Sequence, residues 1–124
     1  TVAAIRHVTT GGYLKQIRAY ENTEINPRFA AIRERLVAMT AKYEAVVNAV
    51  VETKNQEYID FVARRMVEMA GHIIMTYLLI IDATRDERFA TSAEVYINYA
   101  EAEVEKHYAF INNFKPEEVE KYKA

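Results

Sequence analysis

The segment Phe61–Ile81 constrains the fold most, because its second half has no polar face. At about 100° per residue, an ordinary surface helix places one apolar stripe against the core. The stripe here contains Ala63, Met66, Ala70, Ile74, Tyr77 and Ile81. Phe61, Met75 and Leu79 line the opposite side. A chain of 124 residues offers few helices to surround such a segment, so we expect a helix that docks onto a second protein surface.

Composition favours an all-α fold. The chain has only three glycines and two prolines, too few for the many turns of an all-β or α/β protein. Short connections force neighbouring helices to be antiparallel, so we expect an up-down antiparallel four-helix bundle. The predicted helices cover about 2–21, 27–52, 56–84 and 89–113, and Gly11-Gly12 interrupts the first of them.

The second predicted helix has the clearest start and the clearest seam. Asn26 is a good N-cap, and Pro27 occupies the first helical position, where its missing N–H costs nothing. The apolar residues then follow alternating spacings of three and four, which is typical of a left-handed bundle. They are Phe29, Ile32, Leu36, Met39, Tyr43, Val46 and Val50. Asn55 is the candidate cap of the third helix.

The fourth predicted helix carries two apolar stripes. Its core stripe contains Phe89, Ala93, Tyr96, Ala100, Val104, Tyr108 and Ile111. Pro116 ends the helix, because the residue before a proline avoids helical geometry. Val95, Tyr99 and Phe110 form a flanking stripe outside this core arc. Aromatic residues and methionine are enriched in interfaces, so the sequence predicts a protein interface formed by Phe61, Met75, Leu79, Val95, Tyr99 and Phe110.

One domain, 1–114, and a charged C-terminal tail, 115–124, account for the chain. The formal net charge of −2 and the lack of a basic patch make nucleic acid an improbable partner. The longest apolar run, Ile73–Ile81, covers about half the length needed to cross a bilayer, so we expect no membrane span. The chain has no cysteine and no secretory leader, which favours the cytoplasm. It begins at Thr1 rather than Met, which suggests a fragment of a longer protein.

Two Glu–His pairs raise the alternative of a metal-binding four-helix bundle. Glu68 with His72 and Glu103 with His107 are each spaced i, i+4. Di-iron bundles instead use Glu-x-x-His, which is absent from this chain. The predicted phases turn Glu68 and His72 outward and His107 inward, so the two pairs should not converge on one ion. We therefore expect surface ion pairs and a buried histidine rather than a metal site.

No recognisable catalytic constellation stands out. Gly11-Gly12 follows no strand and precedes no Gly-Lys-Ser/Thr, so it is not a phosphate loop. The tyrosines at helical spacing, Tyr43, Tyr77, Tyr96 and Tyr108, are expected in the core. Gly71 lies in the middle of the third helix, where a close helix–helix approach, or alternatively a π-bulge or kink, would explain it.

The third predicted helix contains Ala-Gly-His-Ile-Ile-Met at 70–75, followed by Tyr-Leu-Leu at 77–79 and Ala83. These residues resemble the C-terminal extension of bacterial acyl-CoA dehydrogenases. The sequence Thr91-Ser-Ala-Glu-Val-Tyr96 is similar to the Thr-x-Ala-x-x-Tyr with which the fourth helix opens in the family. Arg6 with Gly11-Gly12 resembles the junction that follows the catalytic domain, which assigns 1–22 to that junction. The family often has a tryptophan in the third helix, and this chain has none.

This resemblance implies a parent flavoenzyme that binds FAD and oxidises a fatty acyl-CoA between C2 and C3. It places the catalytic base and the FAD contacts upstream of Thr1, so this chain itself is expected to be non-catalytic and to hold no cofactor. Its implied partners are the upstream catalytic domain and neighbouring subunits of a homo-oligomer. A stand-alone dimerisation module and the metal-binding bundle remain the alternatives.

Overall fold

The protein is all-α in a computed structural model that describes residues 2–123, with the side chains of 3–122. Six α-helices are present and no strand occurs among the described residues. The helices are α1 (Val2–Thr9), α2 (Gly12–Glu21), α3 (Ala30–Glu52), α4 (Gln56–Arg85), α5 (Ala90–Asn113) and α6 (Val119–Lys123). Short 3₁₀ turns precede α3, α5 and α6, at η1 (Pro27–Phe29), η2 (Glu87–Phe89) and η3 (Pro116–Glu118). The all-α prediction is confirmed. Thr1 and Ala124, at the outer ends of the predicted junction and tail, lie outside the described residues.

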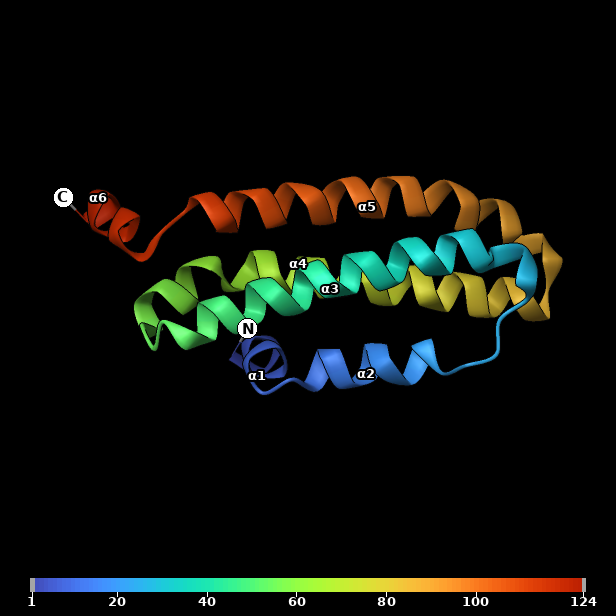
Figure 1. Cartoon of the computed structure of the whole chain (residues 1–124), viewed down its shortest axis with the longest axis horizontal. Helices are drawn as coiled ribbons and strands as arrows, with labels where there is room; N and C mark the ends of the chain where they lie inside the picture. Colours follow the sequence, from blue (N-terminus) through green and yellow to red (C-terminus); the bar gives the residue numbers. More distant parts are fainter. Residues whose placement is uncertain (1, 124) are drawn as a thin grey trace.

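The long helices α3 and α4 lie side by side in the middle of the molecule, with α5 along one edge and α2 along the other (Figure 1). Consecutive members of the series α2, α3, α4 and α5 run in opposite directions (Figure 1). Helix α1 turns across this direction and packs against α2 and α4. The α4–α5 contact is the most extensive one between two helices.

Local sequence signals set the helix boundaries. The Asn26 side chain accepts a hydrogen bond from the Arg28 backbone N–H at 2.9 Å, and the Asn55 side chain accepts one from the Tyr58 N–H at 3.1 Å. Both predicted caps are confirmed, although a 3₁₀ turn intervenes between Asn26 and α3.

The interruption predicted at Gly11-Gly12 divides the first predicted helix into α1 and α2. Gly11 adopts φ +83°, a left-handed conformation that a side chain would strain. The two short helices therefore meet at a bend instead of forming one helix over 2–21.

Helix α4 is the central helix and contacts α1, α2, α3, α5 and α6. It buries far more than the predicted stripe, and the additional buried apolar side chains include Tyr58, Ile59, Val62, Met69, Ile73 and Ile80. Ile74, predicted in the stripe, is half-buried. The expectation that so short a chain could not surround this helix is therefore wrong for most of its circumference.

The core of α5 differs from the predicted stripe in three places, one of them near its end, where Tyr108 is half-buried and His107 is buried. Phe89 lies in η2 and is 43% exposed, because the helix begins only at Ala90, which is buried in its place. Ile97 is buried although the predicted stripe passes through Tyr96, which is half-buried. The buried arc of α5 is therefore rotated by about one residue near its start.

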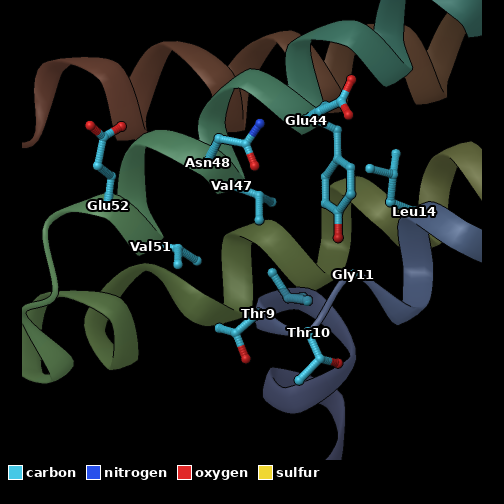
Figure 2. A pocket seen from close by; sticks show the side chains of 11 residues that line it. Thr9, Thr10, Gly11, Leu14, Glu44, Val47, Asn48, Val51 and Glu52 are labelled. Carbon is cyan, nitrogen blue, oxygen red and sulfur yellow. The ribbon is translucent and has the colours of Figure 1, made fainter.

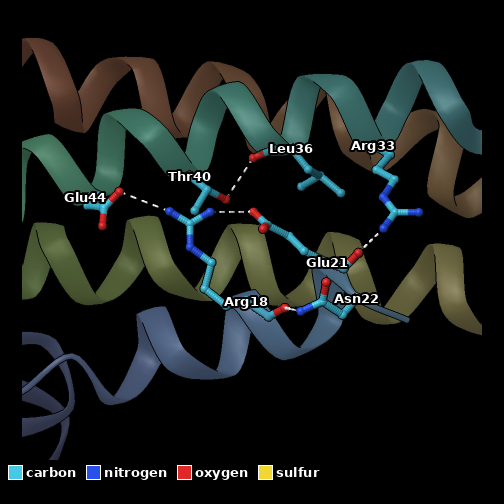
Figure 3. Close-up of polar contacts among 7 residues, drawn as sticks. All are labelled: Arg18, Glu21, Asn22, Arg33, Leu36, Thr40 and Glu44. Carbon is cyan, nitrogen blue, oxygen red and sulfur yellow. Dashed lines mark hydrogen bonds and ion pairs between the residues drawn. The ribbon is translucent and has the colours of Figure 1, made fainter. Parts of the chain in front are cut away.

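Polar contacts attach α2 to α3 (Figure 3). Arg18 forms ion pairs with Glu21 at 2.8 Å and with Glu44 of α3 at 3.0 Å. The Arg33 guanidinium of α3 donates to the Glu21 backbone carbonyl. The Thr40 hydroxyl turns back to the Leu36 carbonyl at 2.8 Å, which satisfies a buried side chain within its own helix.

The C-terminal segment folds back against α4 and α5. Val119 is buried, and the Tyr58 hydroxyl donates to the Phe114 carbonyl at 2.7 Å. The Phe114 ring is stacked with Phe61 at a centroid distance of 4.8 Å and with Phe110 at 5.3 Å. The charged tail therefore covers one end of the α4–α5 pair.

Candidate protein-interaction face

The six residues predicted as an interface occupy α4 and α5, the two helices with the most extensive contact. Four of them are exposed: Phe61 at 42%, Met75 at 47%, Val95 at 65% and Tyr99 at 54%. Leu79 and Phe110 are half-buried and pack against the core.

Sequence reasoning missed two exposed apolar side chains near these six. Leu78 is exposed where Leu79 is half-buried, because α4 turns the latter toward its neighbours. Tyr122 of α6 is exposed and lies 5.4 Å from the Phe61 ring, centroid to centroid. The signal for Leu78 was its spacing of three from Met75, which places both on one edge of the helix.

An aromatic cluster fixes the middle of this face. The His72 Nδ1 and the Tyr96 hydroxyl are 3.0 Å apart. The Tyr99 ring meets the His72 ring edge-on at 5.4 Å, and Tyr96 and Tyr99 are 5.8 Å apart. Tyr99 thus presents an exposed ring whose orientation is supported by two neighbours.

The other end of the face is basic and aromatic. Here a pocket of about 540 Å³ lies between α4, α5 and α6. It is lined by Phe61, Arg64, Arg65, Glu68, Lys106, His107, Phe110 and Tyr122. The Arg65 guanidinium lies 3.7 Å from the centroid of the Phe110 ring, a cation–π contact that joins α4 to α5.

Glu68 and His107 meet across the two helices, which corrects the predicted phases. Their Oε2 and Nε2 atoms are 2.9 Å apart, although they are too poorly aligned for a hydrogen bond. Arg65 approaches His107 Nδ1 at 3.2 Å. Because a guanidinium only donates, Nδ1 is the acceptor and the neutral ring carries its proton on Nε2, toward Glu68. Burial lowers the pKa of His107 below its ordinary value, against the opposing effect of Glu68.

The proposed i, i+4 pairs do not form. Glu68 pairs with Arg64 at 3.2 Å and Glu103 with Lys106 at 3.0 Å, while His72 binds Tyr96. Among the residues that the structure describes, no group of three or more His, Asp or Glu side chains could hold a metal ion. The four candidate ligands are therefore engaged in separate contacts.

A second pocket, of about 360 Å³, lies between the α1–α2 bend and the C-terminal half of α3 (Figure 2). Thr9, Thr10 and Gly11 border it on one side, and Val47 and Val51 of α3 on the other (Figure 2). Its charged side chains are the carboxylates Glu44 and Glu52.

Two tyrosines are buried with unsatisfied hydroxyls. Tyr43 and Tyr77 are at most 1% exposed, and neither hydroxyl has a hydrogen-bond partner in the structure. Burial raises the pKa of Tyr77 to about 12 and raises that of Tyr43 further. Tyr96 and Tyr108 are half-buried against the core. These side chains contribute bulk to the core, as the sequence predicts for tyrosines at helical spacing.

Helix α4 is long and apolar enough to cross a membrane by length and composition alone, with a mean hydropathy of 1.5 over its best window. Half of that window is buried inside the protein. The central position of α4 accounts for this apolar character, because a core helix meets the same criterion.

The all-α fold, with an exposed apolar face on α4 and α5, defines a helical domain. The family described as "Acyl-CoA dehydrogenase C terminal" matches residues 9–119. The chain therefore belongs to this family of acyl-CoA dehydrogenase C-terminal domains. It is similar to a solved structure of an acyl-CoA dehydrogenase family protein from Porphyromonas gingivalis, at 45% identity and a TM-score of 0.86. The match covers 92% of this chain and 99% of that one. No curated protein matches the chain.

The residues present do not fit the FAD that this family implies. The pocket beside the α1–α2 bend has two carboxylates and no cation to neutralise a pyrophosphate. In the basic pocket each cation is already paired: Arg65 with Phe110 and His107, Arg64 with Glu68, and Lys106 with Glu103. We therefore assign no flavin contact to this chain.

Proposed function

We propose that this chain is the non-catalytic C-terminal helical domain of an FAD-dependent acyl-CoA dehydrogenase that oxidises fatty acyl-CoA. Its role is to pack against the catalytic domain and to form contacts between subunits in a cytoplasmic homo-oligomer. Helices α2 to α5 serve as the up-down four-helix bundle of the domain, and 1–22 as the junction with the catalytic domain.

One observation carries the proposed packing role. Eight large apolar side chains are exposed among the described residues, and six of them lie on α4, on the stripe of α5 that flanks it, or on α6. They are Phe61, Met75, Leu78, Val95, Tyr99 and Tyr122. Such a concentration on one face is typical of a surface that another protein covers.

The experiment uses the intact protein from which this chain derives. We expect it to be much longer than this chain, to show the visible absorption of an oxidised flavin and to lose that absorption when acyl-CoA is added. Deleting residues 23–124 should leave the flavin bound but change the oligomeric state measured by sedimentation. A natural protein no longer than this chain, without flavin, would contradict the proposal and favour a stand-alone dimerisation module.

The solved relative gives that alternative a specific basis. Because the match covers 99% of the solved chain, that chain is about as long as this one. The absorbance spectrum of the intact protein separates the two functions.

A further inference from the structure

Gly71 is unexplained by the interior of the protein. It lies in the middle of the 30-residue helix α4, is exposed, and a Cβ placed on it would meet no atom within 4 Å. The close helix–helix approach predicted within this chain is therefore absent, and α4 shows no break at this residue. A glycine at such a position costs about 1 kcal/mol of helix stability relative to alanine. The explanation left for a glycine at position 71 is the close approach of a second protein chain to this part of α4.

Gly71 belongs to an exposed edge of α4 that repeats with spacings of three and four, which is the spacing of a coiled-coil seam. We call this edge the outer stripe. It consists of Phe61, Arg64, Glu68, Gly71, Met75, Leu78, Asp82 and Arg85. Seven of the eight are exposed, and Glu68 is intermediate. At 1.5 Å per residue the stripe is roughly 36 Å long.

Two copies of the outer stripe present complementary residues to each other when they lie antiparallel. In two antiparallel copies related by a two-fold axis through the middle of α4, Gly71 faces Met75 of the second copy. The Met75 side chain, 47% exposed, then fills the depression that Gly71 leaves. Arg64 faces Asp82 of the second copy at both ends of the contact, so opposite charges meet twice. Because the two-fold axis exchanges the copies, every such contact occurs in duplicate.

The remaining two positions are compatible with this register. Phe61 faces Arg85 of the second copy, which pairs an aromatic ring with a cation. Leu78 faces Glu68, whose carboxylate is directed sideways toward His107 and Arg64 within its own chain.

The charges at the ends are available for this pairing. Arg64 has a side chain that is 89% exposed and holds only the i, i+4 pair with Glu68, which is worth little in water. The Asp82 carboxylate makes no ion pair with any described residue. Arg64 and Asp82 lie too far apart on one helix to pair with each other. A second, antiparallel copy of the chain supplies an oppositely charged partner to each of them.

We propose that the outer stripe of α4 binds the outer stripe of a second copy of this chain, antiparallel and about a two-fold axis. This inference deepens the oligomer role proposed above and rests on it for its biological setting. It identifies the contacting helix, its direction and its register, with Val95 and Tyr99 of α5 flanking the contact.

The test is sedimentation equilibrium of the purified chain and five variants. We expect the wild type to dimerise reversibly. Arg64→Asp and Asp82→Arg should each raise the dimer Kd about tenfold, because each replaces two attractions with two repulsions. The double variant should return to within about threefold of the wild type, because the ion pairs re-form with reversed polarity. Circular dichroism should show unchanged helix content in all of them, since both side chains are exposed.

Gly71→Gln supplies a test that is independent of charge. Its side chain would fill the depression and displace Met75 of the second copy, raising Kd, whereas Ala102→Gln at an exposed site on α5 should not. A wild type that is monomeric at all concentrations would overturn the proposal, as would a double variant that dimerises more weakly than either single one. Equal losses from Gly71→Gln and Ala102→Gln would also overturn it. None of these results depends on flavin or acyl-CoA, so the proposed function stands or falls separately.

Discussion

Replacing Gly71 by alanine should stabilise the folded chain. Gly71 is helical, and a Cβ at this position would meet nothing within 4 Å, so the methyl group adds no clash. Alanine also restricts the unfolded chain more than glycine does. The free energy of unfolding should therefore rise by about 1 kcal/mol, and the Tm of a domain of this size by about 4 °C.

The other two glycines provide matched controls. Gly11→Ala should lower the unfolding free energy by about 1 kcal/mol, because a side chain at φ +83° is strained. At Gly12 the new Cβ would lie 2.6 Å from His7 Nδ1. That imidazole can move aside, so Gly12→Ala should fall between the other two variants.

The assay is urea unfolding followed by circular dichroism, at a concentration where sedimentation shows only monomer. Dilution is essential, because any dimer formed through the outer stripe would add its own concentration-dependent stability. If Gly71→Ala were neutral or destabilising in the monomer while Gly11→Ala behaved as expected, the open surroundings of Gly71 would be refuted.

Two further predictions concern buried polar groups. Tyr43→Phe should leave the unfolding free energy unchanged or raise it slightly, because the Tyr43 hydroxyl has no hydrogen-bond partner. Tyr58→Phe should lower the unfolding free energy by about 1 kcal/mol, because it removes the hydrogen bond to the Phe114 carbonyl. Parallel urea titrations of the two variants measure the difference. Burial lowers the pKa of His107, so the unfolded chain binds a proton at this residue more readily than the folded chain does. The free energy of unfolding should therefore be highest above about pH 7 and should decline as the pH falls through the ordinary histidine pKa of about 6.5. His107→Gln should flatten the unfolding free energy between pH 7.5 and 5.5, roughly the range in which histidine titrates, and an unchanged slope would contradict the assignment.

Local signals allowed the helix boundaries to be predicted. Asn26 with Pro27, and Asn55, each begin a helix through a side-chain cap, which depends only on neighbouring residues. Gly11 gives the bend between α1 and α2 for an equally local reason, its left-handed backbone. The seam of α3 was also predictable, because all seven of its predicted residues are buried in the structure.

Features that depend on several helices at once were not predictable. The contact between Glu68 and His107 requires the rotation of α4 relative to α5, and a single stripe per helix does not define it. Helix α4 packs against neighbours on several sides, so its buried arc is wider than one stripe and Leu79 turns inward while Leu78 stays exposed. Val119 shows the same limitation, because its burial depends on where α4 and α5 leave space for the tail.

The apolar character of α4 has two separate causes, and the structure distinguishes them. Most of its circumference is apolar because five other helices surround it, and this part would be apolar in a monomer. In its first half the outer stripe contacts α6 through Phe61 and α5 through Glu68, whereas Met75 and Leu78 lie exposed beside a glycine in its second half. A monomer leaves Met75 and Leu78 exposed to water, whereas a second helix packed along the stripe would bury both. A polar replacement such as Met75→Glu should therefore leave the monomer folded and abolish association, while a core replacement such as Met66→Ala should cost about 2–5 kcal/mol of stability at any concentration.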